Sequence, residues 1–395
     1  MQLELQNVSK KVGSEFHISD VSLTFQAGTL NILLGPTLSG KTSLMRLMAG
    51  LDQPTSGRIL VKGKDVTGVA VQKRNVAMVY QQFINYPNLT VYENIASPLR
   101  IAKTEQNLID EKVEKIAKLL KLEDMLNRSP QELSGGQQQR TALARALVKG
   151  AELVLLDEPL ANLDYKLREE LREELPLIFA ETGSIFVYAT TEPSEALLLG
   201  GNTATLHEGK VTQFGKTLDV FNRPGNLTTA KTISDPPLNC LPVTKLNNTM
   251  LYQPAWLDYK AQPQQTNKNP TAATQPSTAK SSNRCHVEIP LIGKLPQLPD
   301  NDYTIAFRPH HLFLEKKRET ADMIHVKAKV VVAEITGSES YIHIDVAGVR
   351  WVVLTKGIHN FDVHDTIEVF LDPATFYVFD RNEQLVVTPE KLPLL

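Results

Sequence analysis

The residues best suited to chemistry form a glycine-bounded segment between two apolar runs. Residues 30–34 are typical of a buried strand, and residues 43–49 have helical composition. A strand, a glycine-containing loop and a helix in this order form a phosphate-binding loop, whose curled backbone points N–H groups at phosphate oxygens. Lys41 would then reach the β- and γ-phosphates of a nucleotide, and the Thr42 hydroxyl would coordinate Mg²⁺. The predicted loop consists of Gly35, Pro36, Thr37, Leu38, Ser39, Gly40, Lys41, Thr42 and Ser43. A glycine-containing turn that binds nothing is the simpler alternative, and the flanking strand and helix argue against it.

A second apolar run, residues 153–156, is followed by two carboxylates, Asp157 and Glu158. Continuous apolar runs are typical of central strands in a parallel sheet, and such sheets bind ligands beyond the carboxyl ends of their strands. Asp157 there suits binding of Mg²⁺, directly or through another ligand, and Glu158 suits polarisation of an attacking water. Two acids at a strand end can also form a solvated turn. The upstream phosphate loop favours the catalytic interpretation.

Two polar segments have weaker signals when each is considered alone. Gln81 follows the apolar run 75–80, where an ordinary surface loop is the better interpretation. A serine, two glycines and a glutamine precede the helical run 141–147, and a helix start of this kind can bind an anion. An ordinary helix N-cap would explain the serine but not the three residues after it. These four residues are Ser134, Gly135, Gly136 and Gln137.

Composition limits the classes of function. The chain has 395 residues, with 42 Lys and Arg against 44 Asp and Glu. This balance gives no electrostatic case for nucleic acid as a partner. Two cysteines, Cys240 and Cys285, fit a reducing compartment and exclude both a disulfide framework and a cysteine metal cluster. The first residues do not resemble a signal peptide, and no apolar run approaches the roughly 20 residues of a membrane helix. We therefore expect a soluble, cytoplasmic protein.

The length predicts two or three domains. We expect an α/β domain over residues 1–235, with a helical subdomain at about 85–150, followed by a second domain over residues 236–395. Short β-branched runs separated by turn residues predict a small all-β barrel there. The Gln/Thr/Pro/Ser/Asn tract at about 262–283 is too poor in apolar residues to pack, so we expect a disordered insertion. Adjacent histidines, His310 and His311, are expected on a strand with their side chains on opposite faces, as surface residues.

The order of these motifs resembles that of the ATP-binding subunits of ABC transporters over roughly the first 235 residues. The phosphate loop is followed by Gln81, then by Leu133-Ser-Gly-Gly-Gln137 (the signature segment), residues 153–159 and Ala161-Asn-Leu-Asp164. The signature segment distinguishes this family from other phosphate-loop ATPases. The resemblance implies an α/β ABC ATPase domain, and residues 307–312 and 333–337 resemble the regulatory barrel (OB/TOBE-like) of carbohydrate-type importers.

The resemblance also implies cofactors and partners. ATP and Mg²⁺ would bind in a head-to-tail dimer, in which each ATP lies between the phosphate loop of one subunit and the signature segment of the other. Thr42, Gln81 and Asp157 would contact Mg²⁺, and Asp164 would act across the dimer interface. Gln81 would lie in the loop that couples the nucleotide to the transmembrane permease subunits, which a periplasmic solute-binding protein serves indirectly.

The chain departs from the family at three positions. Val12 occupies the place of an aromatic residue that stacks on adenine, and Leu38 that of a glycine in the phosphate loop. Thr191 occupies the place of a histidine that contacts the γ-phosphate. A threonine donates one hydrogen bond but lacks the charge and reach of an imidazolium. We therefore expect slow turnover at the ATP site built on this phosphate loop.

Within the family, residues 75–100 and the missing histidine resemble one of the two unlike ATPases of bacterial glycerol (glycerol-phosphate) importers. This implies an ATPase on the cytoplasmic face of the membrane, paired with a second ATPase subunit, either unlike this chain or a second copy of it. Two alternatives remain open. One is a soluble ABC ATPase of DNA repair or translation. The other is a non-catalytic nucleotide-binding subunit that completes the partner's site.

Overall fold

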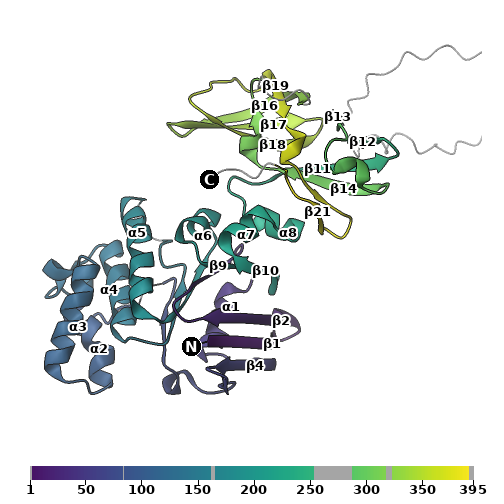
Figure 1. Cartoon of the computed structure of the whole chain (residues 1–395). Helices are drawn as coiled ribbons and strands as arrows, with labels where there is room; N and C mark the ends of the chain where they lie inside the picture. Colours follow the sequence, from purple (N-terminus) through teal and green to yellow (C-terminus); the bar gives the residue numbers. More distant parts are fainter. Residues whose placement is uncertain (1, 83, 162–164, 253–286, 317–322, 391–395) are drawn as a thin grey trace, which may run out of the picture. The chain divides into compact units, whose positions relative to one another are not determined.

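The computed structural model describes residues 2–82, 84–161, 165–252, 287–316 and 323–390. It divides the chain into two compact units, Met1–Ile233 and Ser234–Leu395, which are treated separately below (Figure 1). Asp164 and the tract at 262–283, for which the sequence makes predictions, lie outside the described residues.

A six-stranded sheet in strand order β10-β9-β3-β8-β7-β6 forms the centre of the first unit. All neighbouring strands pair in parallel except β10, which is antiparallel to β9. Every residue of β3, β7 and β8 is buried, as expected for strands covered on both faces. The strands are β3 (Leu30–Leu34), β6 (Val76–Val79), β7 (Leu153–Asp157), β8 (Ile185–Thr190), β9 (Asn202–His207) and β10 (Lys210–Lys216).

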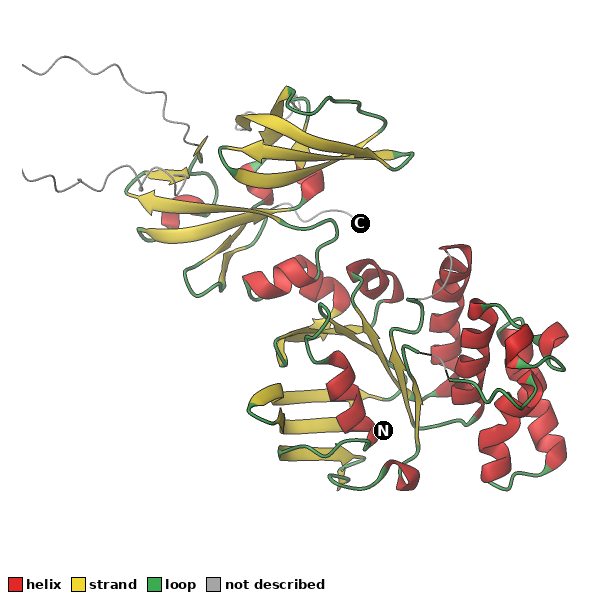
Figure 2. Cartoon of the chain, turned by 180° about the vertical axis from the view of Figure 1, so that it is seen from behind, coloured by secondary structure: helices red, strands yellow, loops and turns green. Residues whose placement is uncertain are grey.

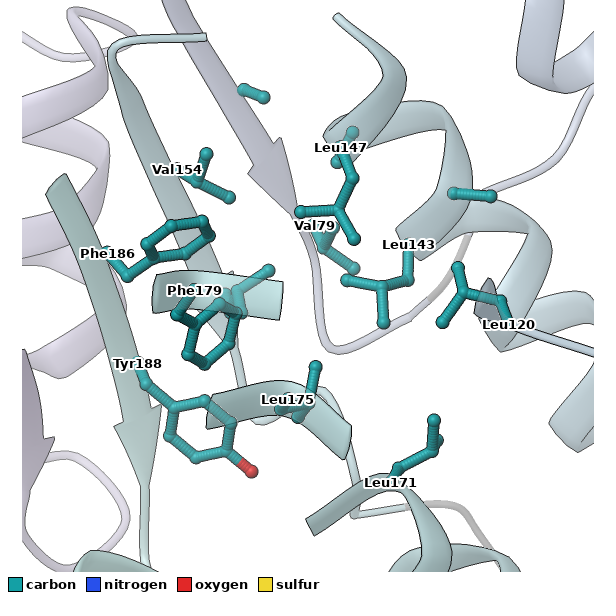
Figure 3. Packing of buried hydrophobic residues seen from close by; sticks show 14 of the residues in the cluster. Val79, Leu120, Leu143, Leu147, Val154, Leu171, Leu175, Phe179, Phe186 and Tyr188 are labelled. Atoms are coloured by element: carbon teal, nitrogen blue, oxygen red, sulfur yellow. The ribbon is translucent and has the colours of Figure 1, made fainter. Parts of the chain in front are cut away.

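Alternate residues of the central strands face two different apolar clusters. Leu33, Leu155 and Val187 pack with α1 and with an antiparallel sheet of order β2-β1-β4-β5. Val154, Phe186 and their neighbours pack on the other face, against α2 to α5 (Figure 3). Figure 2 shows helices gathered on that side of the central sheet. These elements are β1 (Gln2–Val12), β2 (Glu15–Gln26), β4 (Ser56–Val61), β5 (Lys64–Asp65), α1 (Lys41–Ala49), α2 (Val91–Ile101), α3 (Gln106–Leu119), α4 (Gly135–Val148) and α5 (Tyr165–Thr182). The chain of this unit continues through α6 (Pro193–Leu199), α7 (Thr217–Asn222) and α8 (Leu227–Thr232).

Two antiparallel sheets make up the second unit, with strand orders β13-β12-β11-β14-β20-β21 and β15-β19-β16-β17-β18. Trp351 lies in the core that they share: its indole N–H donates to the Cys240 carbonyl at 3.2 Å, and its ring meets Phe307 edge-on. The predicted all-β, barrel-like second domain is confirmed. Its strands are β11 (Asn239–Leu246), β12 (Thr249–Tyr252), β13 (Val287–Glu288), β14 (Asn301–Phe307), β15 (Leu312–Phe313), β16 (Ile324–Ile335), β17 (Glu339–Val346), β18 (Val349–Lys356), β19 (Thr366–Leu371), β20 (Tyr377–Phe379) and β21 (Leu385–Val387).

For the two adjacent histidines, the expected strand is wrong and so is the expected exposure of His311, whereas His310 is exposed as expected. They lie in a 3₁₀ turn, Pro309–His311, rather than on a strand, and His311 is buried. Their rings pack edge-on, 4.3 Å apart, because successive residues of a turn do not alternate between faces. Pro309, which fixes its own φ and has no N–H to donate to a ladder, favours the turn over a continuing strand.

Candidate nucleotide-binding site

The candidate site forms where the central strands end side by side. Leu34 pairs with Thr190, and Asp157 pairs with Ala189, so the carboxyl ends of β3, β7 and β8 lie at one edge. The Gly35 N–H donates to the Thr190 carbonyl at 3.3 Å, which joins the start of the phosphate loop to the end of β8. This edge gathers residues from four separate parts of the chain: the phosphate loop, Gln81, Asp157 with Glu158, and Thr191.

The phosphate loop depends on glycine at two positions where other backbone atoms approach closely. A Cβ on Gly35 would lie 2.5 Å from the Leu206 carbonyl oxygen, and one on Gly40 would lie 2.9 Å from the His17 carbonyl oxygen. Gly40 also has a φ of 102°, and α1 begins at the next residue. Leu38 has a φ of 68° and a side chain that is 95% exposed. The position thus requires the left-handed conformation that glycine adopts freely and leucine adopts only with strain.

Lys41 folds over the loop and places its ammonium group among the site's oxygens. Its Nζ donates to the carbonyls of Gly35 at 2.8 Å and Pro36 at 3.1 Å. The carboxylate of Glu158 lies 3.7 Å away. Burial lowers the pKa of Lys41, and the attraction of Glu158 and Asp157 opposes that effect. A compact cation is therefore held where a phosphate-binding loop needs one.

Thr42 and Asp157 bring a hydroxyl and a carboxylate together. The Thr42 hydroxyl donates to the Asp157 carboxylate at 2.9 Å. Asp157 is buried, which raises the pKa of its carboxyl group, while the Thr42 hydrogen bond acts in the opposite direction. Mg²⁺ in nucleotide sites is bound by one or two such oxygens together with phosphates and water. This pair fits Mg²⁺, and the site does not need the clusters of three or more His, Cys, Asp or Glu that are absent from the described residues.

Glu158 and Gln81 meet although they follow different strands. The Gln81 side-chain amide donates to the Glu158 carboxylate at 3.0 Å. The Glu158 N–H donates to the Ala189 carbonyl at 3.0 Å, and its φ of 47° lies in the left-handed region. Backbone strain in a non-glycine residue concentrates at functional sites, where the surrounding structure holds it in place. One oxygen of this carboxylate thus accepts from Gln81, and the other lies 3.7 Å from the Lys41 ammonium group.

Two supporting features of the loop have no obvious signal in the sequence. The Gly209 N–H, in the turn between β9 and β10, donates to the Ser39 carbonyl at 3.0 Å and supports the loop from a distant segment. The Ser39 hydroxyl is buried without a hydrogen-bond partner within the described part of the chain. A buried hydroxyl without a partner at this place fits a site that accommodates phosphate oxygens.

The signature segment lies apart from this group. Ser134 caps α4, whose residues pack on the face of the sheet opposite α1. The Ser134 hydroxyl accepts from the Gln137 N–H at 3.4 Å, and the Gln137 side chain accepts from the Ser134 N–H at 2.9 Å. The expectation that an ordinary N-cap leaves Gln137 unexplained is wrong, because Gln137 completes a capping box. Gly135 and Gly136 are the first two residues of α4 and lie between Ser134 and Gln137 in the sequence.

Thr191 is exposed and directly follows β8 at the edge of the sheet that bears the phosphate loop. Its two neighbours are held by charged and hydroxyl groups. The Thr190 hydroxyl donates to the buried Glu195 carboxylate at 2.6 Å, and Glu192 pairs with Arg172 at 2.9 Å. The sequence did not predict these partners, because Arg172 lies on α5 and Glu195 on α6, and only the packing of these helices brings both residues close to Thr191.

A groove of about 340 Å³ opens beside the loop that contains Gln81. Its apolar rim includes Ile84 and Ile101, which are 60% and 80% exposed. The Arg145 guanidinium lies over the Tyr86 ring at 4.9 Å, and burial lowers the pKa of Arg145. Acidic side chains are absent from the described residues of the lining, which are Val76, Ala77, Met78, Val79, Tyr80, Ile84, Tyr86, Ser97, Pro98, Ile101, Ala142, Arg145, Ala146 and Lys149. No helix within the described ranges has the length and apolar character needed to cross a membrane.

Comparison with known proteins identifies relatives along nearly the whole chain. A family model described as ABC transporter matches residues 18–161. The trehalose/maltose import ATP-binding protein MalK of Thermococcus litoralis is 32% identical over 394 residues, covering 96% of this chain and 98% of that protein. The uncharacterised ABC transporter ATP-binding protein YcjV of Escherichia coli O6:H1 is 30% identical over 387 residues, covering 98% of this chain and 99% of that protein.

Two further matches cover the first unit alone or little more. The spermidine/putrescine import ATP-binding protein PotA of Haemophilus influenzae is 38% identical over 233 residues, covering 59% of this chain and 63% of that protein. Among solved structures, the dimeric bacterial ABC transporter cassette MJ0796 is 29% identical with a TM-score of 0.50, covering 54% of this chain and 98% of that one.

Proposed function

The chain belongs to the ABC transporter ATPase family of the MalK and PotA import type, in which ATP hydrolysis with Mg²⁺ drives import, and we propose that its own ATP site is the edge described above. The observation that supports this assignment is the convergence of side chains on one phosphate loop. Lys41 contacts the Gly35 carbonyl at 2.8 Å and lies 3.7 Å from Glu158, and Thr42 donates to Asp157 at 2.9 Å.

Each side chain has a separate task in this proposal. Lys41 leaves the loop carbonyls to bind the β- and γ-phosphates, since three donors on a compact cation suit phosphate oxygens. Thr42 and Asp157 would hold Mg²⁺, which would supply positive charge beside the phosphates. Glu158 accepts a hydrogen bond from the attacking water and polarises it, and the Gln81 amide fixes the direction of that carboxylate. Gly35, Pro36, Thr37, Leu38, Ser39, Gly40 and Ser43 form the rest of the cradle.

A second ATPase subunit completes the site. Ser134 and Gly135 are exposed at the start of α4, so the signature segment is accessible to another subunit. We expect Ser134 to Gln137 to contact the nucleotide held by the partner's phosphate loop, with Asp164 acting across the same interface. The capping box does not prevent this role, because the first N–H groups of a helix remain oriented toward an anion.

The groove beside Gln81 is where we expect the permease subunit to dock. Exposed Ile84 and Ile101 offer apolar contact, and Arg145 and Lys149 supply positive charge, with no acidic neighbour among the lining residues that the structure describes. Gln81 lies between this groove and Glu158, so movement at the groove would reach the carboxylate that polarises water. The protein would then be peripheral on the cytoplasmic face of the membrane.

The proposal extends to the imported solute and to the identity of the partner subunit. Thr191 in place of a histidine, strained Leu38 and non-aromatic Val12 all weaken this chain's own site. A transporter can still work with one weak ATP site when an unlike partner subunit has a complete one. This favours an arrangement with two unlike ATPases, as in the glycerol (or glycerol-phosphate) importers that the sequence resembles, and hence glycerol or glycerol phosphate as the solute. A non-catalytic role for this chain's own site is the alternative that Thr191 favours. The hydrogen-bonded Glu158 argues for residual hydrolysis instead.

The experiment is isolation of the tagged chain from detergent-solubilised membranes, followed by mass spectrometry and a glycerol-uptake assay in cells. The proposal expects a multi-spanning permease, a second ABC ATPase with the histidine, and loss of glycerol uptake on deletion of the gene. Recovery of the chain as a soluble homodimer without a permease would contradict it. Recovery with a permease but with unchanged glycerol uptake would reject the solute and retain the transporter.

A further inference from the structure

A cluster of charged and hydroxyl side chains lies immediately behind Thr191. Its inner part is built around Glu195 of α6, whose side chain is 5% exposed. The Glu195 carboxylate accepts from the Tyr188 hydroxyl at 2.9 Å and from the Thr190 hydroxyl at 2.6 Å, and it lies 3.4 Å from Arg172. Tyr188 is fully buried and extends from β8 beside Leu175 of α5 (Figure 3).

The outer part of the cluster is built around Glu192, which directly follows Thr191. One oxygen of its carboxylate lies 2.9 Å from Arg172 and the other 3.1 Å from Arg168, and both arginines belong to α5. The Glu192 N–H donates to the Thr190 hydroxyl at 3.0 Å. The residues on either side of Thr191 are therefore tied to α5, one through Glu195 and the other through two arginines.

This arrangement fixes the direction of a single short turn. The Thr190 carbonyl accepts from the Gly35 N–H, so the turn also abuts the first residue of the phosphate loop. Thr191 itself is exposed at that edge. A threonine has a shorter side chain than a histidine, so its contact with a γ-phosphate tolerates little displacement of the backbone.

We propose that Glu192 is a positioning residue, which holds the turn between β8 and α6 against Arg168 and Arg172 so that the Thr191 hydroxyl donates to the γ-phosphate. This inference rests on the ATP site proposed above. It adds that the chain distinguishes nucleoside triphosphate from diphosphate through ion pairs that do not touch the phosphates. Arg172 orients Glu192, and Glu192 orients Thr191.

The inner and outer parts of the cluster allow the role to be separated from folding. Loss of Glu195 would leave Tyr188 and Arg172 without a buried partner, which destabilises a core. Glu192 is 38% exposed, so its pairs contribute little to stability. Glu192→Gln removes the charge and keeps the size of the side chain. Glu169→Gln is the matched control, because Glu169 pairs with the same Arg172 at 2.6 Å, is 39% exposed, and lies on α5 rather than next to Thr191.

The test measures the affinity of the purified full chain for Mg²⁺ complexes of ADP and of the non-hydrolysable triphosphate AMP-PNP by calorimetry. A hydrogen bond to a charged group contributes about tenfold or more in affinity. We expect Thr191→Ala to lower the preference for AMP-PNP over ADP by on the order of tenfold. Glu192→Gln should lower this preference somewhat less, and the affinity for ADP should be unchanged in both variants. The double variant should lose no more than Thr191→Ala alone, and Glu169→Gln should behave as the wild type.

Each other outcome overturns the inference. Unchanged preference in Glu192→Gln, losses that multiply in the double variant, or an equal loss in Glu169→Gln would show that Glu192 does not act through Thr191. Unchanged preference in Thr191→Ala would remove the contact that Glu192 is said to orient. Lys41→Ala distinguishes these failures from failure of the ATP site itself, because only a wrong site assignment leaves affinity for both nucleotides intact in that variant.

Discussion

The side-chain amide of Gln81 donates to the carboxylate of Glu158 at 3.0 Å, although the two residues are 77 positions apart in the chain. Gln81 follows β6, whose residues line the groove, and Glu158 follows β7 at the phosphate loop. One hydrogen bond therefore joins the proposed permease-docking groove to the carboxylate proposed to polarise water. A signal from a permease would need to alter only this contact to reach the chemistry.

Lys41→Ala should abolish ATP binding at this chain's own loop. Lys41 supplies the cation beside Glu158 and the loop carbonyls, and alanine leaves the phosphate charge without a partner. The measurement is nucleotide affinity of the purified full chain. Lys62→Ala, which removes a 54% exposed lysine of a surface ion pair, is the control and should bind as the wild type. Equal affinity in Lys41→Ala would reject the site.

Leu38→Gly should stabilise the protein. Leu38 has a φ of 68° and is almost fully exposed, so glycine relieves a left-handed strain of roughly 1–2 kcal/mol and loses no burial. The greater freedom of glycine in the unfolded chain offsets roughly 0.5–1 kcal/mol of that gain. We expect a small rise in the free energy of unfolding by denaturant titration. Leu198→Gly, at an exposed position in α6, should lower it. A fall at Leu38 as large as that at Leu198 would show that no strain is present.

Ile101→Glu should separate docking from nucleotide binding. Ile101 is 80% exposed at the rim of the groove, and a carboxylate there would face the apolar surface expected of a permease helix. We expect loss of co-purification with the permease at unchanged ATP affinity. Leu108→Glu, on the exposed side of α3, is the control and should retain the complex. Retention of the permease by Ile101→Glu would place the docking surface elsewhere.

Removal of residues 263–280 should leave folding and transport nearly intact. The segment is polar and of low complexity, so it contributes little burial, and shortening a loop changes its closure entropy only slightly. Melting temperature and uptake of the deletion variant are the measurements. A large drop in either would show that the tract makes a needed contact.

The sequence predicted the elements that depend on local signals. Leu30–Leu34, the glycines at 35 and 40 and the apolar run before Asp157 are enough to predict two buried strands and a phosphate loop between strand and helix. The all-β character of the second unit followed from its short β-branched runs. These signals lie within a few residues of the structure that they predict.

Long-range contacts could not be predicted in the same way. The Gln81 amide reaches Glu158 only because β6 and β7 are neighbours in the sheet, and strand order has no local signal. The hydrogen bond from Gly209 to Ser39 and the ion pair between Glu192 and Arg172 of α5 also depend on tertiary contacts between distant segments. The turn at His310 and His311 was missed because the alternation expected of a strand was applied across Pro309.

We propose that this chain's own ATP site is slow and that its signature segment completes a faster site on the partner. Loss of one positioned donor to a developing charge costs on the order of 10²–10³ in rate, or about 3–4 kcal/mol. Ser134→Arg would block the partner's site, whereas Glu158→Gln would remove the carboxylate proposed to polarise water from a site that we expect Thr191 to have slowed already. The most direct measurement is solute uptake by cells that contain each variant at matched expression. We expect a far larger loss of uptake for Ser134→Arg than for Glu158→Gln, whereas equal losses, or a larger loss for Glu158→Gln, would contradict this division between a slow and a fast site.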